Sequence, residues 1–405
     1  VPADDPLAHA RRRLDEAGWT AGRLPPARRH AAILVTHDNS GGVERMVRRR
    51  AQSLRAAGAR AILLRPIPDP NSREGGFLPG LCRVEDGTMD TPNLVYRLPD
   101  ELPALLRLLR ADQPKRFEVH HRLGHHPSVM DLADRLGLAP ELHLHDYASF
   151  CPRISLLGPE HRYCGEPTDI AACEACVADA GSRLEDGLGV AALRARSASE
   201  FARARRIVVP SADMAARMRR HFPLVQPDIV PLEDDEVGRL PPPPARLPRR
   251  VCVIGAIGLE KGYDVLLACA RDAARRGLPL EFVLVGHSTD DGRLMDTGRV
   301  FVTGRYDEAD GPALIRAQAA HLAFLPSIWP ETWGFTLGLA WQAGLRAAVF
   351  DIGAMAARIR ATGLGWALPL GLPPAAVNHA LLNPPRSPSL AGSQQDRLWT
   401  SASHT

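Results

Sequence analysis

Short apolar runs alternate with longer amphipathic stretches through the first half of the chain. Ala31–Thr36 (AAILVT) shows no polar alternation, which is typical of a strand buried on both faces. The loop His37–Gly42 (HDNSGG) follows, then a predicted helix over Val43–Ala57 and, after Gly58, a second predicted strand, Ala61–Leu64. Strand, glycine loop, helix and strand make a βαβ unit. Further strands are predicted at Phe117–His120, Glu141–Leu144 and Arg206–Val209.

A proline cluster separates this half from the next. Leu240–Pro248 (LPPPPARLP) suits neither helix nor sheet and is predicted to be a stiff linker. After it the pattern restarts with a strand at Val251–Ile254, a glycine loop at Gly255–Gly262 and a helix at Tyr263–Arg276. More strands are predicted at Glu281–Val285, Val300–Thr303 and His321–Leu325. The fold class is therefore predicted to be α/β, with two facing Rossmann-like domains, parallel sheets and an interdomain cleft.

The domain bounds follow from the same pattern. We expect an N-terminal extension at 1–30, a first domain at 31–239 with an insertion at 151–176, the linker at 240–248, a second domain at 249–382 and a disordered tail at 383–405.

Composition then narrows the function class. Of 405 residues 45% are apolar and 24% charged, as in globular proteins. Mean hydropathy is −0.15, and no run of 18 apolar residues predicts a membrane span. A net charge of +4 is too mild to indicate nucleic-acid binding. Residues 1–30 lack the apolar region of a signal peptide, which indicates a cytoplasmic protein, and the start at Val1 suggests a segment of a longer or trimmed polypeptide.

Lysine is nearly absent from the chain. Lys and Arg total 50, yet the only lysines are Lys115 and Lys261. Lys115 lies in a polar stretch and suggests no role, whereas Lys261 lies in the glycine loop 255–262 (GAIGLEKG), directly after a predicted strand. Glycines let the backbone approach an anion, and an ammonium adds a point charge, so the loop is a candidate phosphate site. The alternative is an ordinary strand–helix turn.

A second loop carries polar residues behind a later strand. In the stretch 324–344 (FLPSIWPETWGFTLGLAWQAG), Ser327, Glu331 and Thr332 follow the strand, and a helix is predicted to begin near Gly334–Thr336. Amides at that helix start could bind phosphate oxygens, and a carboxylate at Glu331 could accept hydrogen bonds from sugar hydroxyls. The alternative for Glu331 is a first-turn glutamate that stabilises the helix dipole.

These motifs, in this order, resemble the retaining family-4 (group 1) glycosyltransferases of the GT-B fold, of the bacterial polysaccharide or O-antigen type. The resemblance rests on GAIGLEKG, on WPETWGFTLGLAWQAG, on HDNSGG followed by VERMV, and on LHLHDYASFCP, and it covers about residues 31–382. It implies a nucleotide-sugar donor held mostly by the second domain and an acceptor held mostly by the first. It also implies that catalysis needs no metal.

The resemblance carries roles over to individual positions. His145 matches the family's histidine near the anomeric centre, Glu331 the first glutamate of its E-x7-E pattern, and Lys261 its diphosphate ligand; these three are the implied catalytic residues. By itself, His145 is as well explained as a hydrogen-bonded histidine at a strand end. The implied donor-binding residues are Gly41, Gly42, Gly255, Lys261, Ser327, Glu331, Gly334, Phe335, Thr336 and Leu337.

The sequence departs from the family pattern at three places. Leu339 stands where the second glutamate of E-x7-E is expected, and that carboxylate usually holds the nucleotide ribose. Losing a charge-assisted hydrogen bond costs on the order of 1.5–3 kcal/mol. The basic residue that often precedes the lysine is missing from Ile257–Glu260, and the tail after Leu382 does not resemble the family's closing helix.

Four cysteines lie in a polar loop that follows His145. Cys151, Cys164, Cys173 and Cys176 have the spacing C-x12-C-x8-C-x2-C. This spacing fits a tetrahedral structural zinc site; one or two disulfides, or free thiols, are the alternatives.

Two further clusters have simpler explanations. The histidines of VHHRLGHH (His120, His121, His125 and His126) suggest a metal, but no matching carboxylates are apparent nearby, so lining a cleft or starting a helix is favoured. The arginines 45, 48–50 and 55 form a basic helix face, usually a solvated one. A membrane-surface patch for a lipid-linked acceptor, with the protein peripheral at the inner membrane face, is the sharper hypothesis.

The favoured function is transfer of a sugar from a nucleotide-sugar donor to a polysaccharide, glycolipid or other glycan acceptor. One rival is a catalytically degenerate sugar-nucleotide-binding or scaffold module of a larger protein, which Leu339 motivates. A second is a GT-B epimerase, which needs acid and base carboxylates that the sequence does not reveal.

Overall fold

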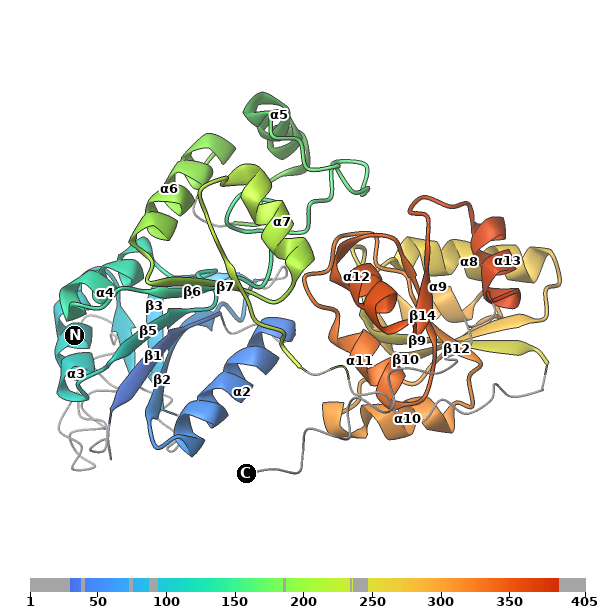
Figure 1. Cartoon of the computed structure of the whole chain (residues 1–405), viewed down its shortest axis with the longest axis horizontal. Coiled ribbons are helices and arrows are strands. Elements are labelled where there is room, and N and C mark those ends of the chain that lie inside the picture. Colours follow the sequence, from blue (N-terminus) through green and yellow to red (C-terminus); the bar gives the residue numbers. More distant parts are fainter. Residues whose placement is uncertain are drawn as a thin grey trace, which may run out of the picture. The chain divides into compact units, whose positions relative to one another are not determined.

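The computed structural model describes residues 30–37, 41–72, 76–86, 94–184, 187–233, 235 and 247–385. Internal contacts divide the chain into unit 1, Val1–Glu160 with Cys164–Glu233, and unit 2, Asp234–Thr405 with His161–Tyr163. Each unit is an α/β domain built on one sheet (Figure 1). The N-terminal extension, the tail beyond Pro385 and most of the proline linker fall outside the described residues.

The sheet of unit 1 has eight strands in the order β4-β3-β2-β1-β5-β6-β7-β8. Their bounds are β1 Ala31–Val35, β2 Arg60–Pro68, β3 Phe77–Glu85, β4 Val95–Arg97, β5 Arg116–Val119, β6 Glu141–His143, β7 Arg206–Val209 and β8 Asp228–Ile229. The helices are α2 Gly42–Ala56, α3 Leu102–Ala111, α4 Asp131–Leu136, α5 Ile170–Ala180, α6 Val190–Arg203 and α7 Ala212–His221, with the short 3-10 helix η1 at Pro127–Met130.

Strand β1 is central in unit 1, which explains its unbroken apolar sequence. All five of its side chains are buried, and it pairs in parallel with β2 and β5. Helix α2 packs Val47, Ala51 and Leu54 against the β1–β2 part of the sheet. The antiparallel strands β3 and β4 form an edge that the sequence pattern did not predict. Their pattern is hard to read because β3 contains a proline and a glycine and is only partly buried.

The sheet of unit 2 has six strands in the order β11-β10-β9-β12-β13-β14, and each neighbouring pair is parallel. Its strands are β9 Arg249–Ile257, β10 Leu280–Ser288, β11 Val300–Val302, β12 Leu322–Leu325, β13 Ala347–Phe350 and β14 Gly365–Leu368. Its helices are α8 Tyr263–Arg275, α9 Asp291–Met295, α10 Gly311–Ala317, α11 Phe335–Gln342, α12 Gly353–Thr362 and α13 Pro374–Leu382, with the 3-10 helix η2 at Glu308–Asp310.

Both faces of this second sheet are buried. In β9, Val251 and Val253 join an apolar cluster with α8 and α13, whereas Cys252 and Ile254 face a second cluster with α10, α11 and α12. Successive strand residues point to opposite faces, so a strand covered on both sides must be apolar throughout. The predicted α/β fold with two Rossmann-like sheets is confirmed: the sheet of unit 2 is parallel throughout, and that of unit 1 is parallel except at β3 and β4.

Candidate functional site

In unit 2, the two loops with predicted donor-site residues lie against each other. The first follows β9 and contains Lys261; the second follows β12 and contains Ser327 and Glu331. The backbone amide of Ile328 donates to the carbonyl of Glu260 at 3.0 Å, which fastens one loop to the other. The carboxyl ends of adjacent parallel strands meet at one sheet edge, and β9 and β12 are adjacent. Two loops about 70 positions apart in the sequence thus lie side by side at one edge of the sheet.

Gly262 makes this close approach sterically feasible. It lies at the N-cap of α8 with φ of +83°, and a Cβ atom at this position would overlap the carbonyl oxygen of Pro326. Only glycine combines left-handed backbone with no side chain at such a contact. Gly255 was predicted as a loop residue, but it lies within β9 and pairs with Gly286 of β10. The strand continues three residues farther than its apolar run.

Glu331 is buried by the loop that contains it. Its Oε1 accepts a hydrogen bond from the Ser327 hydroxyl at 2.7 Å, and its backbone carbonyl accepts from the amide of Ala354 at 2.8 Å. Glu331 and Ser327 are 8% and 4% exposed. Glu331 precedes the N-cap of α11, so it is not the first-turn glutamate of the simpler explanation. One of its carboxylate oxygens already accepts a hydrogen bond from Ser327.

The predicted amides lie at the start of α11. Gly334 is the N-cap, with φ of +80°, and Phe335 is the first helical residue. The methyl group of Thr336 would lie 3.0 Å from a Cβ built on Gly255, so this helix start reaches the end of β9. The Leu337 amide already donates to the Gly334 carbonyl at 3.1 Å. A phosphate that used the Leu337 amide would have to share it with that turn.

Lys261 is the positively charged residue of the loop between β9 and α8. Its side chain is half-buried, and among the described residues it has neither a hydrogen-bond nor an ion-pair partner. Many of the arginines, in contrast, are paired with carboxylates. An unpaired ammonium beside a glycine turn can bind an anion without first breaking another contact.

Leu339 is a core residue of unit 2. It is 7% exposed and packs in the cluster that includes Ile315 and Trp341, and its methyl groups lie 3.6 Å from where a Cβ on Gly311 would be. The departure from the E-x7-E pattern is therefore a change from a carboxylate to an apolar packing group, and Leu339 itself provides no ribose ligand.

Arg358 of α12 supports the second loop and was missed in the sequence. It is 6% exposed, and its Nη1 donates at 3.0 Å to the carbonyls of both Trp333 and Gly334. Its guanidinium also stacks 4.1 Å from the centre of the Trp333 ring and pairs with Asp235. The only sequence signal is an arginine inside an otherwise apolar helix face, which in an arginine-rich chain is not distinctive.

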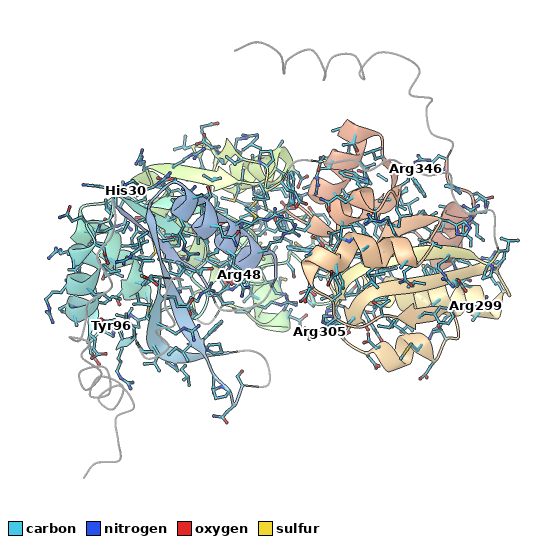
Figure 2. The ribbon with its side chains drawn as sticks, turned by 90° about the horizontal axis from the view of Figure 1, so that it is seen from below. His30, Arg48, Tyr96, Arg299, Arg305 and Arg346 are labelled. Atoms are coloured by element: carbon cyan, nitrogen blue, oxygen red, sulfur yellow. The ribbon has the colours of Figure 1, made fainter. Side chains whose placement is uncertain are left out.

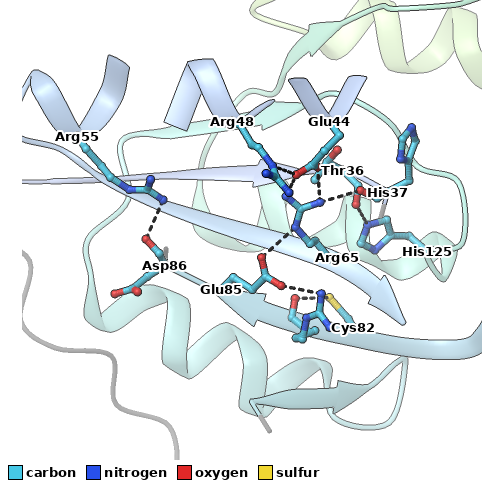
Figure 3. A network of polar contacts seen from close by, with 11 residues as sticks. Thr36, His37, Glu44, Arg48, Arg55, Arg65, Cys82, Glu85, Asp86 and His125 are labelled. Atoms are coloured by element: carbon cyan, nitrogen blue, oxygen red, sulfur yellow. Dashed lines mark hydrogen bonds and ion pairs between the residues drawn. The ribbon is translucent and has the colours of Figure 1, made fainter. Parts of the chain in front are cut away.

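In unit 1, a buried arginine holds the two ends of the first glycine loop. Arg65, on β2, donates to the His37 carbonyl at 3.0 Å, to both oxygens of Glu44 and to Glu85 (Figure 3). His37 follows β1 and Glu44 lies in the first turn of α2, so Arg65 fixes where the loop leaves the strand and enters the helix. Residues 38–40 lie outside the described residues.

Gly41 and Gly42 lie at the start of α2. Gly41 is the N-cap with φ of +136°, and nothing lies within 4 Å of a Cβ built on it. Both glycines are exposed, which leaves the backbone of this helix start open to a ligand.

His145 follows β6 and is half-buried at the end of a row of polar groups. Its Nε2 lies 3.0 Å from Nδ1 of His120, which follows β5, and the two rings are stacked with an interplanar angle of 11°. Nε2 of His120 lies 3.6 Å from Oε2 of Glu118, a fully buried carboxylate on β5. Arg50 of α2 donates to both oxygens of Glu118, at 2.8 and 2.6 Å.

The expectation that no carboxylate accompanies the histidine cluster is wrong. Glu118 and His120 are two residues apart on an extended chain, so they share a face. A second carboxylate, that of Asp146, forms a hydrogen bond with His121, with 3.0 Å between Oδ2 and Nε2. The simpler interpretation agrees with the structure in that all four histidines line a cavity of unit 1, and His126 also caps η1 by accepting from the Ser128 amide. Arg50, assigned to a solvated basic face, instead points inward to Glu118.

Burial lowers the pKa of several histidines in unit 1. It lowers the pKa of His37 and of His125 to about 4 and that of His143 to about 3, with neighbouring cationic groups adding to the effect. Burial, together with His120 and His143, lowers the pKa of His145 well below its usual value. His145 is therefore a neutral hydrogen-bonding group at pH 7. Burial alone would raise the pKa of Asp146, but His121 and the Ala148 amide outweigh it and lower the value to about 2.

A cavity of about 420 Å³ opens beside this row of histidines. It lies at the carboxyl ends of β5 and β6, where ligands of parallel α/β sheets bind. The residues that line it include His120, His145, Asp146, Arg122, Glu200 and Phe201. Unit 1 by itself therefore has room for a polar ligand in contact with His145.

The arginines of α2 are largely paired within unit 1. Arg45 and Arg49 contact Glu233, and Arg48 contacts Glu44, four residues earlier on the same helix. Figure 2 labels Arg48, whose side chain is 74% exposed. Because these partners offset much of the positive charge, the membrane-surface patch stays a hypothesis. Among the described residues, no helix is both long and apolar enough to cross a bilayer.

The four cysteines are neighbours in unit 1, but their sulfur atoms are not gathered around a point. Cys173 and Cys176 lie one turn apart on α5. Burial raises the pKa of Cys151 to about 11, and electrostatic coupling to the three other cysteines adds to the rise. All four are free thiols. Among the described residues, only Glu118, His120 and His143 bring three metal-ligand atoms within 4.8 Å of one another.

The sequence matches no protein-family model and no curated protein sequence. Its structure is similar to that of sucrose-phosphate synthase from Thermosynechococcus elongatus, with 16% identity, a TM-score of 0.53, and coverage of 88% of this chain and 90% of that one. Anabaena Alr3699/HepE in complex with UDP is 12% identical, with a TM-score of 0.51 and coverage of 87% and 90%. The lipopolysaccharide outer core galactosyltransferase WaaB is 12% identical, with a TM-score of 0.51 and coverage of 87% and 89%. At these identities the likeness establishes the fold alone, which is GT-B.

Proposed function

We propose that the chain is a glycosyltransferase of the retaining family-4 type, which moves a sugar from a nucleotide-sugar donor to a glycan or lipid-linked acceptor without a catalytic metal. The observation that carries the proposal is the junction of two loops in unit 2. The Ile328–Glu260 hydrogen bond and the glycine contact at Gly262 join the loop that contains Lys261 to the loop that holds Glu331, and Lys261 has no ion-pair partner among the described residues. A cation and a carboxylate presented from one sheet edge match the two ends of a sugar diphosphate.

The proposed chemistry is an exchange at the anomeric carbon. The bond from that carbon to the diphosphate oxygen breaks, a bond to an acceptor hydroxyl oxygen forms, and the hydroxyl proton passes to the departing diphosphate. Lys261, with amides at the start of α11, stabilises the negative charge that develops on the diphosphate. Glu331, with one oxygen held by Ser327, uses the other to orient the sugar. Neutral His145 forms a hydrogen bond to the sugar near the reacting carbon.

Unit 1 is proposed to bind the acceptor. Its 420 Å³ cavity contains both charged groups and an aromatic ring, which suit a carbohydrate. Among the structural neighbours, Alr3699/HepE forms a complex with UDP and WaaB is a lipopolysaccharide galactosyltransferase, so UDP-sugars are the first donors to test. Retention is tested separately, by the NMR coupling constant of the anomeric proton in the product.

A donor screen by thermal shift tests the proposal. UDP-, GDP- and dTDP-sugars are added to the full chain, and a bound donor raises the apparent melting temperature by mass action. We expect a shift with at least one donor, and nucleotide release when that donor is incubated with the protein. Absence of both, at millimolar donor, would contradict the proposal.

A catalytically degenerate donor-binding or scaffold module is the second candidate, and Leu339 is the observation that favours it. The buried leucine takes the place of the carboxylate that would hold a ribose. The same screen separates the two functions. A thermal shift without nucleotide release, with every acceptor and donor tried, indicates a binding module.

The cysteines are proposed to hold a structural zinc ion. Helix α5 has no fully buried side chain, so apolar packing does little to hold this part of the insertion. Arg194 donates both to the Phe150 carbonyl and to the Cys173 sulfur, which brings the residue next to Cys151 close to α5. Zn–S bonds of about 2.3 Å would need the sulfurs to close by side-chain rotation.

Metal analysis of the reduced full-length chain tests this site. We expect about one zinc per chain, and loss of it in Cys176→Ser. Cys269→Ser, which removes a buried thiol of unit 2, is the matched control and should retain the metal. If the wild-type protein, purified under reducing conditions, contains no zinc, the zinc proposal is wrong and the four cysteines are free thiols.

A further inference from the structure

Three polar side chains of unit 1 form a row that ends at His145. Glu118 lies 3.6 Å from Nε2 of His120, and Nδ1 of His120 lies 3.0 Å from Nε2 of His145. Glu118 is 0% and His120 is 4% exposed, so water does not compete strongly for these contacts. Arg50 lies beyond the Glu118 end of the row, and its two hydrogen bonds hold the carboxylate in place.

The row has a direction because its first member can only accept. An ionised carboxylate has no proton to donate, whereas a neutral imidazole has one donor nitrogen and one acceptor nitrogen. Among the described residues, Nε2 of His120 makes no hydrogen bond, and the carboxylate oxygen 3.6 Å away is the negative charge that it faces. That field favours the proton of His120 on Nε2, which leaves Nδ1 as an acceptor.

We propose that Glu118 and His120 are positioning residues that fix the tautomer and the ring orientation of His145. An accepting Nδ1 on His120 requires His145 to carry its proton on Nε2. Nδ1 of His145 is then an acceptor, which is the polarity that matches a donating sugar hydroxyl. The inference rests on the proposed contact between His145 and the sugar, and adds two residues that act only through His145.

A transition-metal site at Glu118, His120 and His143 is the competing interpretation, because their ligand atoms lie within 4.8 Å of one another. Two observations disfavour it. Both oxygens of Glu118 already accept from Arg50, with Arg116 3.4 Å away as a second cation. The His120 and His143 rings are also stacked, 4.5 Å apart at 21°. Imidazole lone pairs lie in the ring plane, so nearly parallel rings do not direct them to one ion.

The test is the tautomer of His145, read by two-bond ¹H–¹⁵N correlation in the full chain with ¹⁵N-labelled histidine. The signals are assigned by their loss in His145→Gln. In the wild-type protein we expect His145 to be neutral with its proton on Nε2. His120→Asn can place its amide oxygen near the position of Nδ1 and retain an acceptor, so it should preserve this pattern. His120→Phe fills the space but removes the acceptor, so it should give a mixture of tautomers.

Kinetics supply the second readout. With a donor that the protein uses, His120→Phe should lower kcat about 10-fold or more and change the donor KM by less than about 3-fold, because the tautomer affects transition-state contacts more than ground-state binding. His120→Asn should restore most of kcat. If His120→Phe does not fold, Glu118→Gln replaces it, because an amide can donate to His120 and thus removes the fixed polarity.

Three results would overturn the proposal. The first is the same His145 tautomer in the wild type and in His120→Phe or its replacement. The second is a wild-type tautomer with the proton on Nδ1. The third is stoichiometric zinc that shifts the His120 and His143 signals together. Failure of the proposed function looks different: no donor is turned over, while the tautomer still follows residue 120.

Discussion

Units 1 and 2 both place candidate polar residues at the carboxyl ends of parallel strands, but they hold them by different means. In unit 1, buried ion pairs fix the site: Arg50 holds Glu118, and Arg65 holds Glu44. In unit 2, close backbone contacts fix the site, at Gly262 and through the Ile328–Glu260 hydrogen bond, while Lys261 has no ion-pair partner in the part of the chain that the structure describes. A network of charges is sensitive to pH and to loss of a partner. A steric junction is sensitive to a single methyl group.

Removing the unpaired cation of unit 2 should give the largest effect. Lys261→Ala should lower donor turnover by about 100-fold or more, since one group that stabilises transition-state charge contributes on the order of 3 kcal/mol. Lys115→Ala is the control, because Lys115 is the other lysine of the chain and is exposed. Nucleotide release from the donor is the measurement. Equal rates for the two variants would contradict the donor-site assignment.

Breaking the charge network of unit 1 should have the next largest effect. Glu118→Ala leaves Arg50 without its partner, and because Arg50 is 26% exposed we expect a loss of about 2–3 kcal/mol in the free energy of unfolding. Asp134→Ala removes an exposed ion pair with Arg203 and should change stability by less than about 0.5 kcal/mol. Urea unfolding compares them. A Glu118→Ala protein as stable as wild type would mean that this carboxylate does not hold the site together.

Adding a methyl group at Gly262 tests the close contact between the two loops of unit 2. Gly262→Ala should lower stability by about 1–3 kcal/mol and weaken donor binding, because the new Cβ overlaps the Pro326 carbonyl and separates the two loops. Gly277→Ala is the control, with a similar positive φ but nothing within 4 Å of the added Cβ. Gly277→Ala should lower the free energy of unfolding by only about 1 kcal/mol, because alanine is disfavoured in left-handed backbone. The difference is measured by thermal unfolding with and without donor.

Mild acid should destabilise unit 1 by a smaller amount. The pKa values of His37 and His125 are lowered to about 4 in the folded chain, so the unfolded chain binds protons first as pH falls. Their contribution is complete above about pH 6.5 and is lost between about pH 6.5 and 4, at about 1 kcal/mol for each residue by pH 5.5.

Hydrogen exchange can locate this acid effect. At pH 7 and 5.5, with intrinsic rates corrected, protection should fall more in peptides from β1 and β5 than in peptides from β9 and β12. Equal losses in the two units would show that the buried histidines of unit 1 are not responsible.

The α/β fold was predictable because buried parallel strands have a distinctive sequence. The apolar runs of β1 and β9 are both covered on two faces, and each is followed by a glycine loop and a helix. The antiparallel strands β3 and β4 carry mixed residues, so periodicity missed them. In the candidate site, Lys261 and Glu331 were apparent because each lies in a loop directly after a strand. Arg358 and Glu118 were not, because a buried arginine or glutamate in a helix or strand is indistinguishable, in one sequence, from a surface residue.

The sequence by itself determined the two α/β halves, the strand-end positions of the polar loops and the scarcity of lysine. These are local properties: apolar periodicity, glycine placement and residue type. Only the tertiary structure decided which charges are paired, because Arg50 and Glu118 are 68 residues apart and meet only when α2 packs on the β1–β2 part of the sheet, next to β5. It also decided that Leu339 is a core residue and that Gly262 must be glycine, since both depend on distant neighbours. Residue identity sets the chemistry available, and packing sets which groups remain free to use it.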